Sequence, residues 1–200
     1  MTANREKYGA AILAGGNNTR FNGINKALLE YNGEKFIKKI SDTLASVFDE
    51  IIVISNISGE LEKNINYPVF EDKIKSCGPL SGIHAALFYS MKDYVFMVSC
   101  DMPFIRKDII EKQIDYFSMF SGDVCIPKSK EYIEPLHAIY SKKILHQLEN
   151  FLLTSDNFKI MNFLKNTDIC YWDTDYLINA KESFININTP EEFNKYLKGV

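Results

Sequence analysis

Two groups of residues in this chain have the types and spacing that phosphate and metal chemistry requires. The first lies in segment 10–26, where a short apolar run gives way to Gly15 and Gly16 and then to polar residues that include Arg20 and Lys26. Glycine lets the backbone adopt positive φ and approach a ligand closely, so that N–H groups can point at anionic oxygens. Arg20 and Lys26 would add full positive charges. The pattern indicates a phosphate-holding loop, and the alternative is a plain strand-to-loop turn with incidental basic residues.

Two better-known glycine loops are excluded by spacing. The P-loop requires a glycine followed at a fixed distance by Gly-Lys-Ser/Thr, and no such run is present. The dinucleotide fingerprint G-x-G-x-x-G also fails, because Gly15 and Gly16 are followed by Asn17-Asn18-Thr19-Arg20.

The second group centres on one carboxylate. Residues 94–100 are mostly apolar, Asp101 follows them directly, and Pro103 ends the run. Mg²⁺ prefers oxygen ligands and usually takes one or two protein carboxylates together with waters and substrate phosphate. Asp101 is therefore a candidate magnesium ligand, and its alternative role is to cap the following helix.

Strands and helices must alternate to place these residues at one edge of a sheet. Helical periodicity over 36–48, 79–91 and 108–119 separates the apolar runs. The alternation predicts an α/β fold with a largely parallel sheet covered by helices on both faces, in which ligands bind beyond the carboxyl ends of the strands. The expected strands are Ala10–Leu13, Ile51–Ile54, Tyr94–Cys100, Val124–Ile126 and Phe184–Ile187.

Composition narrows the class of protein. Two hundred residues with 46% hydrophobic and 24% charged side chains suit one compact domain. A net charge of −3, with charges interspersed, argues against nucleic acid as a partner. The apolar run after Arg5 and Lys7 is too short for a signal peptide, and no segment reaches the length of a membrane span, so we expect a cytoplasmic protein.

Cysteine and histidine spacing suggests no metal or redox motif. The cysteines never form C-x-x-C, which excludes the usual zinc and redox patterns and favours buried, reduced thiols. The histidines also lack ligand spacing. These residues are Cys77, Cys100, Cys125, Cys170, His84, His137 and His146.

The glycine loop resembles that of a known family. Its Leu13-Ala14-Gly15-Gly16, Thr19-Arg20-Phe21 and Asn25-Lys26-Ala27-Leu28 are similar to the signature of the nucleotidyltransferases, and more narrowly of the molybdenum cofactor guanylyltransferase family. In that family the loop holds the triphosphate of GTP and the lysine contacts phosphate. The chain departs from the family at Asn22, where glycine is frequent, and at Asn25, where aspartate is frequent. The resemblance implies nucleotide binding by Leu13, Ala14, Gly15, Gly16 and Lys26.

Later motifs in the first half resemble the same family. Asp72, at the end of Val69-Phe70-Glu71-Asp72, and Gly78 and Gly82, in Gly78-Pro79-Leu80-Ser81-Gly82, would help to hold the guanine nucleoside. A carboxylate can accept hydrogen bonds from the N1–H and amino group of guanine, although Asp72 could instead cap a helix or turn. Asn56, after the second expected strand, would contact the nucleotide or form a turn. Cys-Asp-x-Pro around Asp101 also matches, which implies that Asp101 holds Mg²⁺ and contacts the nucleotide.

The second half carries the implied acceptor site. Residues 132–140 resemble a family segment that returns towards the site, and we assign His137 in it no catalytic role. Residues 186–191 match the family's Asn-x-Asn-Thr-Pro-Glu, which implies that Asn186 and Asn188 contact molybdopterin. Asn188 or Thr189 could also cap the last helix, with Pro190 at its first position.

The resemblance runs from about Ala10 to about Phe193 and implies a Rossmann-like three-layer fold with one strand opposed to the others. It also implies a single domain, 1–200, in which about 8–105 binds GTP and Mg²⁺ and about 106–200 binds molybdopterin. The expected reaction transfers GMP from GTP to the phosphate of molybdenum-molybdopterin, with Arg20, Lys26 and Asp101 as catalytic residues and transient contact with molybdopterin-delivering and molybdoenzyme-maturation proteins.

Two other functions are consistent with the residues. A cytidylyltransferase of the same fold would make the cytosine dinucleotide of the cofactor or activate another phosphate or sugar. Such enzymes more often have Leu-Ala-Ala-Gly, so Gly15, together with Asp72 and Gly78-Pro79-Leu80, favours guanine. A non-catalytic nucleotide-binding domain is the other alternative. The presence of Arg20, Lys26 and Asp101 together argues against it.

Overall fold

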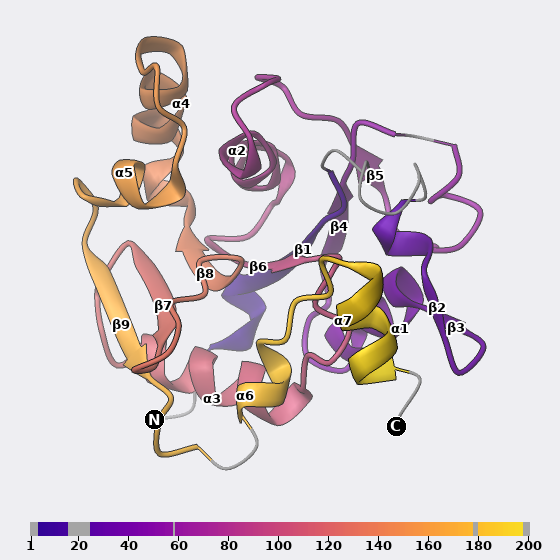
Figure 1. The fold of residues 1–200 in the computed structure, drawn as a ribbon. Helices are drawn as coiled ribbons and strands as arrows, with labels where there is room; N and C mark the ends of the chain where they lie inside the picture. Colours follow the sequence, from indigo (N-terminus) through magenta and orange to yellow (C-terminus); the bar gives the residue numbers. More distant parts are fainter. Residues whose placement is uncertain (1–3, 16–24, 58, 178–179, 198–200) are drawn as a thin grey trace.

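The computed structural model describes residues 4–15, 25–57, 59–177 and 180–197 (Figure 1). Its centre is a seven-stranded sheet with the strand order β5-β4-β1-β6-β8-β7-β9. Strand β8 runs antiparallel to β6 and β7, whereas the other neighbouring strands are parallel, as the resemblance implied. The strands are β1 (Tyr8–Leu13), β4 (Ile51–Ile54), β5 (Val69–Phe70), β6 (Tyr94–Ser99), β7 (Val124–Lys128), β8 (His137–Ser141) and β9 (Ile169–Asp173).

Helices cover both faces of the sheet, which confirms the predicted three-layer α/β fold. Side chains alternate between faces along a strand, so Ala10 and Ile12 of β1 join the core under α1 and α3, while Ala11 and Leu13 join the core under α2 and α4. Both cores run the width of the sheet. The helices are α1 (Phe36–Ala45), α2 (Pro79–Tyr89), α3 (Lys107–Ser118), α4 (Leu145–Thr154), α5 (Ile160–Leu164), α6 (Ala180–Ser183) and α7 (Pro190–Leu197).

The order of the strands reverses its direction at β1. The chain proceeds from β1 to β4 and β5 on one side and then crosses to β6 on the other. In open α/β sheets, ligands bind at the carboxyl ends of the strands where the winding reverses in this way. Both chemical segments found in the sequence lie at this edge, because Ala14 and Gly15 follow β1 and Asp101 follows β6.

The predicted strand Phe184–Ile187 is wrong. The segment begins in a turn after α6, pairs with no described strand, and connects α6 to α7. Its apolar residues pack elsewhere: Phe184 contacts the rings of Tyr132 and His137, and Ile187 is buried with Phe36. The alternating apolar residues of this segment are therefore buried by other side chains, and their pattern does not reflect pairing within a sheet.

Several short elements were not predicted. Strands β5, β8 and β9 are among them, as is the hairpin of β2 (Glu30–Tyr31) and β3 (Glu34–Lys35). The hairpin turns at Asn32 and Gly33, whose φ angles are 54° and 78°. Asn-Gly is the preferred pair for a two-residue turn with positive φ at both positions, so the sequence does contain a pattern that predicts this hairpin. Short 3-10 helices occupy Arg5–Lys7 (η1), Lys26–Leu28 (η3) and Lys142–Ile144 (η4).

Within the described ranges, no helix has the length and apolar character needed to cross a membrane.

Candidate active site

Strand β1 delivers the start of the glycine loop to the carboxyl edge of the sheet. The N–H of Ala14 donates to Ile54 O at 2.8 Å, and Leu13 O accepts from the N–H of Cys100 at 3.1 Å. Gly15 is exposed, and a Cβ built on it would meet no atom of the described residues within 4 Å. Among the described residues, nothing fills the space beside the Gly15 backbone, where a ligand was predicted. Gly16 and Arg20 fall outside the described residues.

Lys26 joins three parts of the chain that are distant in sequence. Its ammonium group donates to Asp101 Oδ2 at 3.1 Å and to Asn188 Oδ1 at 2.8 Å. The side chains of Lys26 and Asp101 are only 17% and 14% exposed, so water screens this ion pair weakly. The buried Asn25 fixes the start of η3, since its Oδ1 accepts from the N–H of Ala27 at 3.0 Å. Asparagine performs this capping role without the aspartate that is frequent in the family.

Asp101 lies in a turn directly after β6. The N–H of Met102 donates to Ser99 O at 3.1 Å, and Asp101 O accepts from the N–H of Ile187 at 2.8 Å. While Oδ2 binds Lys26, Oδ1 is buried and has no hydrogen-bond partner in the described part of the chain. Leaving a buried carboxylate oxygen unpaired is costly.

The unpaired oxygen fits a role in binding a divalent cation. No group of three or more metal-ligating side chains occurs among the described residues. A single carboxylate oxygen suits Mg²⁺, which keeps several waters and takes further oxygens from substrate phosphates. Among the described residues, Asp101 Oδ1 therefore fits the requirements of a Mg²⁺ ligand.

Asn56 and Asp72 contact each other at the ends of β4 and β5. Asn56 Nδ2 donates to Asp72 Oδ2 at 2.6 Å, and the N–H of Asp72 donates to Asn56 Oδ1 at 3.1 Å. Partial burial raises the pKa of Asp72, and the hydrogen bond from Asn56 opposes that rise. The pair holds the carboxyl group of Asp72 in a fixed orientation at the same edge of the sheet.

The second glycine turn leads into α2. Gly78 adopts φ 61° and ψ −145°, a conformation that side-chain-bearing residues rarely take, and Pro79 begins the helix as predicted. A Cβ on Gly82 would lie 3.3 Å from the Leu13 side chain, so this glycine permits close packing of α2 on β1. The two predicted glycine segments therefore meet at Leu13.

The C-terminal segment supplies the two predicted asparagines and a capped helix. Thr189 Oγ1 accepts from the N–H of Glu192 at 3.2 Å, and Glu192 Oε2 accepts from the N–H groups of Asn188 and Thr189 at 2.6 and 3.1 Å. This reciprocal capping box confirms the cap expected at the start of α7. It also fixes the backbone that carries Asn188 to Lys26.

Glu134 is a further ionisable residue near this site, and no sequence motif indicated it. It lies in the turn before β8, and its half-buried carboxyl group has a pKa raised to about 7 by burial, with Asp101 raising it further and a hydrogen bond with Asn186 opposing the rise. A glutamate followed by proline in 132–140 was a weak signal. Its importance depends on neighbours more than thirty positions away.

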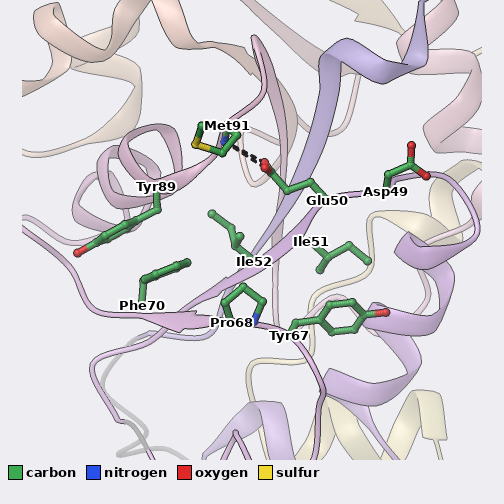
Figure 2. A pocket seen from close by; sticks show the side chains of 9 residues that line it. All are labelled: Asp49, Glu50, Ile51, Ile52, Tyr67, Pro68, Phe70, Tyr89 and Met91. Atoms are coloured by element: carbon green, nitrogen blue, oxygen red, sulfur yellow. Dashed lines mark hydrogen bonds between the residues drawn. The ribbon is translucent and has the colours of Figure 1, made fainter.

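A pocket of about 490 Å³ lies away from these residues, at the amino end of β4 (Figure 2). Its lining includes Asp49, Glu50, Tyr67 and Tyr89, and none of the predicted site residues. Figure 2 shows the Glu50 side chain directed at the backbone of Met91. Glu50 Oε2 accepts a hydrogen bond from the N–H of Met91 at 3.1 Å. The pocket is thus separate from the carboxyl-edge site.

Residues 10–168 match the family described as MobA-like NTP transferase domain. The chain belongs to this family. Among MobA-like relatives, the probable molybdenum cofactor guanylyltransferase of Clostridium perfringens is 39% identical over 198 residues, covering 96% of this chain and 97% of the relative. The molybdenum cofactor guanylyltransferase of Syntrophotalea carbinolica is 31% identical, covering 95% and 91%.

Solved structures agree with this membership of the MobA-like family. The crystal structure of molybdopterin-guanine dinucleotide biosynthesis protein A from Archaeoglobus fulgidus matches with a TM-score of 0.81 and 26% identity, covering 94% of this chain and 96% of that one. The predicted nucleotidyltransferase fold is confirmed. Within it, the side chain of Lys26 contacts both Asp101 and Asn188, and Asn56 and Asp72 form a separate pair.

Proposed function

We propose that this protein transfers GMP from GTP to the phosphate of molybdenum-molybdopterin, forming molybdopterin guanine dinucleotide and pyrophosphate. The observation that carries the proposal is the convergence of Lys26, Asp101 and Asn188 at the carboxyl edge of the sheet, in a chain so similar to guanylyltransferases. The contact joins the half proposed to bind GTP, about 8–105, to the half proposed to bind molybdopterin, about 106–200.

The proposed reaction is an in-line displacement that needs no covalent enzyme intermediate. An oxygen of the acceptor phosphate attacks the α-phosphorus of GTP, the new P–O bond forms, and the bond from the α-phosphorus to the bridging oxygen of the β-phosphate breaks. The electron pair leaves with pyrophosphate. Because the nucleophile is already an anion, the protein has to position two anions and neutralise their charge.

Named residues divide this work. Lys26 neutralises phosphate charge, Arg20 and the amides of Gly15 and Gly16 bind the triphosphate, and Asp101 holds Mg²⁺ through Oδ1. When bound, Mg²⁺ would polarise the phosphate oxygens and offset their negative charge. Asp72, oriented by Asn56, accepts hydrogen bonds from guanine, and Gly78 and Gly82 let backbone approach the nucleoside. Asn186 and Asn188 bind the acceptor.

The partners of the proposed reaction are GTP and molybdenum-molybdopterin as small molecules. The proposal also includes transient contacts with proteins that deliver molybdopterin and with proteins that mature molybdoenzymes.

Dinucleotide formation tests the proposal directly. Purified protein is incubated with Mg²⁺, molybdenum-loaded molybdopterin and either GTP or CTP, and the product is identified by mass. We expect the guanine dinucleotide from GTP and none from CTP. Product from CTP alone would assign the cytidylyltransferase alternative, and no product from either would refute the proposed transfer.

A further inference from the structure

Two cysteines that are far apart in the sequence are neighbours in the sheet. Cys125 lies in β7 and Cys170 in β9, and the two residues are direct register partners of these parallel strands. Side chains of register partners point to the same face of a sheet. Both cysteines accordingly join the core under α1 and α3, in which Cys125 is buried and against which Cys170 packs. The fold thus forms a pair of thiols that the cysteine spacing in the sequence did not indicate.

The positions of these two residues suit a disulfide bond. Neighbouring strands of a sheet lie about 4.8 Å apart, and disulfides join residues whose Cα atoms are about 4.4–6.8 Å apart. The register holds over five residues of each strand, 124–128 and 169–173, so both cysteines lie within regular pairing. A bond between the two sulfur atoms therefore requires rotation of side chains but no change of register.

The two thiols differ in their access to solvent. Cys125 is fully buried, and its carbonyl oxygen accepts from Gln113 Nε2 at 3.1 Å. Cys170 is partly exposed and belongs to β9, the last strand in the order of the described sheet. Hydrogen bonding by the Cys125 thiol lowers the pKa of Cys170, although burial opposes this shift. Since the thiolate is the form that reacts with oxidants, Cys170 is the thiol placed to react first.

The remaining cysteines are buried on opposite faces of the sheet. Cys77 joins the core under α2 and α4, whereas Cys100 joins the core under α1 and α3. Burial raises the pKa of Cys100 to about 12, so its thiol stays protonated near neutral pH. These two thiols therefore serve as internal comparisons for the reactivity of Cys170.

We propose that Cys170 and Cys125 form a redox-active thiol pair that hydroperoxides convert to a disulfide. The Cys170 thiolate attacks one peroxide oxygen and the O–O bond breaks, which gives a sulfenic acid on Cys170 and, after protonation, an alcohol or water. The Cys125 sulfur then attacks the Cys170 sulfur, the S–OH bond breaks, and the hydroxide leaves as water with the thiol proton. The two thiols lose two electrons, which the hydroperoxide gains, and a thiol reductant reverses the reaction by exchange.

Peptide mass mapping of the whole protein tests this pair. The wild type, Cys170→Ala, Cys125→Ala and the matched control Cys77→Ala are treated with hydrogen peroxide, with and without dimedone, which traps sulfenic acids. Remaining thiols are blocked, and the digests are compared before and after reduction with dithiothreitol. Circular dichroism and thermal melts establish that each variant is folded.

We expect the wild type and Cys77→Ala to form the disulfide between Cys125 and Cys170, and dithiothreitol to reverse it. In the wild type, Cys170 should be oxidised at least about tenfold faster than Cys77 or Cys100, because its thiol is more exposed and more readily ionised. Cys125→Ala should accumulate Cys170 labelled by dimedone, since the second thiol is missing. Cys170→Ala should form neither product.

Two results would overturn the inference: a folded wild type that forms no disulfide between these cysteines, or oxidation of Cys77 and Cys100 as fast as that of Cys170. Both are measured on the wild type, so they decide the matter even if an alanine variant fails to fold. The reaction uses neither GTP nor molybdopterin, so its outcome is independent of the proposed guanylyl transfer.

Discussion

The ammonium group of Lys26 donates to the side-chain oxygen of Asn188 at 2.8 Å, although 162 positions separate the two residues. The same ammonium group also pairs with Asp101 at 3.1 Å. One cation therefore holds together the connection after β1, the turn after β6 and the segment before α7.

Replacement of Lys26 by methionine should weaken GTP binding about tenfold or more, because a partly buried cation beside the triphosphate would be lost. It also leaves Asp101 without its cation. Calorimetric titration with GTP measures the effect, and Lys165→Met, at an exposed position, is the matched control. Wild-type affinity in Lys26→Met would remove Lys26 from the nucleotide site.

Replacement of Asp101 by asparagine should lower kcat by roughly 10²–10³-fold, since the amide cannot hold Mg²⁺ as a carboxylate does. The amide oxygen can still accept from Lys26, so the melting temperature should change little. Steady-state dinucleotide formation across a magnesium titration gives the comparison. Asp49→Asn, at the amino end of β4 in Figure 2, serves as control. An Asp101→Asn enzyme with full turnover would exclude the metal assignment.

Alanine substitutions at two glycines should have different effects, one on GTP affinity and the other on thermal stability. Gly15→Ala adds a methyl group where no described atom lies within 4 Å, so thermal stability should be retained while GTP affinity falls. Gly78→Ala forces a side chain into φ 61° and should cost roughly 1–3 kcal/mol of stability. Thermal melts and GTP titrations of both variants distinguish the two effects. Undiminished GTP binding by Gly15→Ala would mean that the open space is not part of the triphosphate site.

Asp72 should determine the preference for guanine. If its carboxyl group accepts from the 2-amino group, GTP should be favoured over ITP, which lacks that group, and Asp72→Asn should reduce the preference by about tenfold. Asn56→Ala should have a smaller effect in the same direction, because it only loosens the orientation of Asp72. The ratio of kcat/KM for GTP and ITP measures both. An unaltered ratio in Asp72→Asn would place base recognition elsewhere.

His137 should make the fold sensitive to acid. Complete burial lowers its pKa from 6.5 to about 4, and neither ring nitrogen has a hydrogen-bond partner in the described structure. Between pH 6.5 and 4 the unfolded chain therefore binds a proton that the folded chain refuses, so stability falls as the pH falls through this window. The loss should be about 3 kcal/mol at pH 4.

Urea unfolding between pH 7.5 and pH 4 measures this effect. His137→Leu removes the titrating ring. Over the same pH range, the free energy of unfolding of this variant should therefore fall by about 3 kcal/mol less than that of the wild type. Equal declines in the variant and the wild type would show that another group is responsible for the acid sensitivity.

The local pattern of apolar residues was sufficient to predict those strands that are buried on both faces of the sheet. Ile51–Ile54 was predicted with the correct bounds, and Asp101 was located because a buried parallel strand must end where its apolar run ends. Phe184–Ile187 has similar apolar content, but its residues are buried by His137 and Phe36 rather than by a neighbouring strand. A single segment does not reveal what covers it.

Residues of the candidate site could be predicted only where a short local motif contained a side chain suited to phosphate, metal or ligand binding. Lys26, Asp101 and Asn188 were each found from local motifs, while the contact among them depends on tertiary structure. Glu134 has no local motif of its own. Its position is set by backbone hydrogen bonds that tie its own N–H to Pro127 and the nearby Leu136 to Ser99, and no local pattern encodes these bonds.

Lys26 and Asp101 form hydrogen bonds with Asn188 and Ile187, which lie near the end of the chain. During synthesis, these contacts can form only after residues 187 and 188 have been made. Strands β1 to β8 are complete by Ser141, well before translation reaches Ile187 and Asn188. A nascent chain can thus assemble most of its sheet while the ammonium group of Lys26 still lacks one of its two described partners, Asn188. Competence to bind both substrates would then arise in a late docking step, after most of the hydrophobic core is already buried.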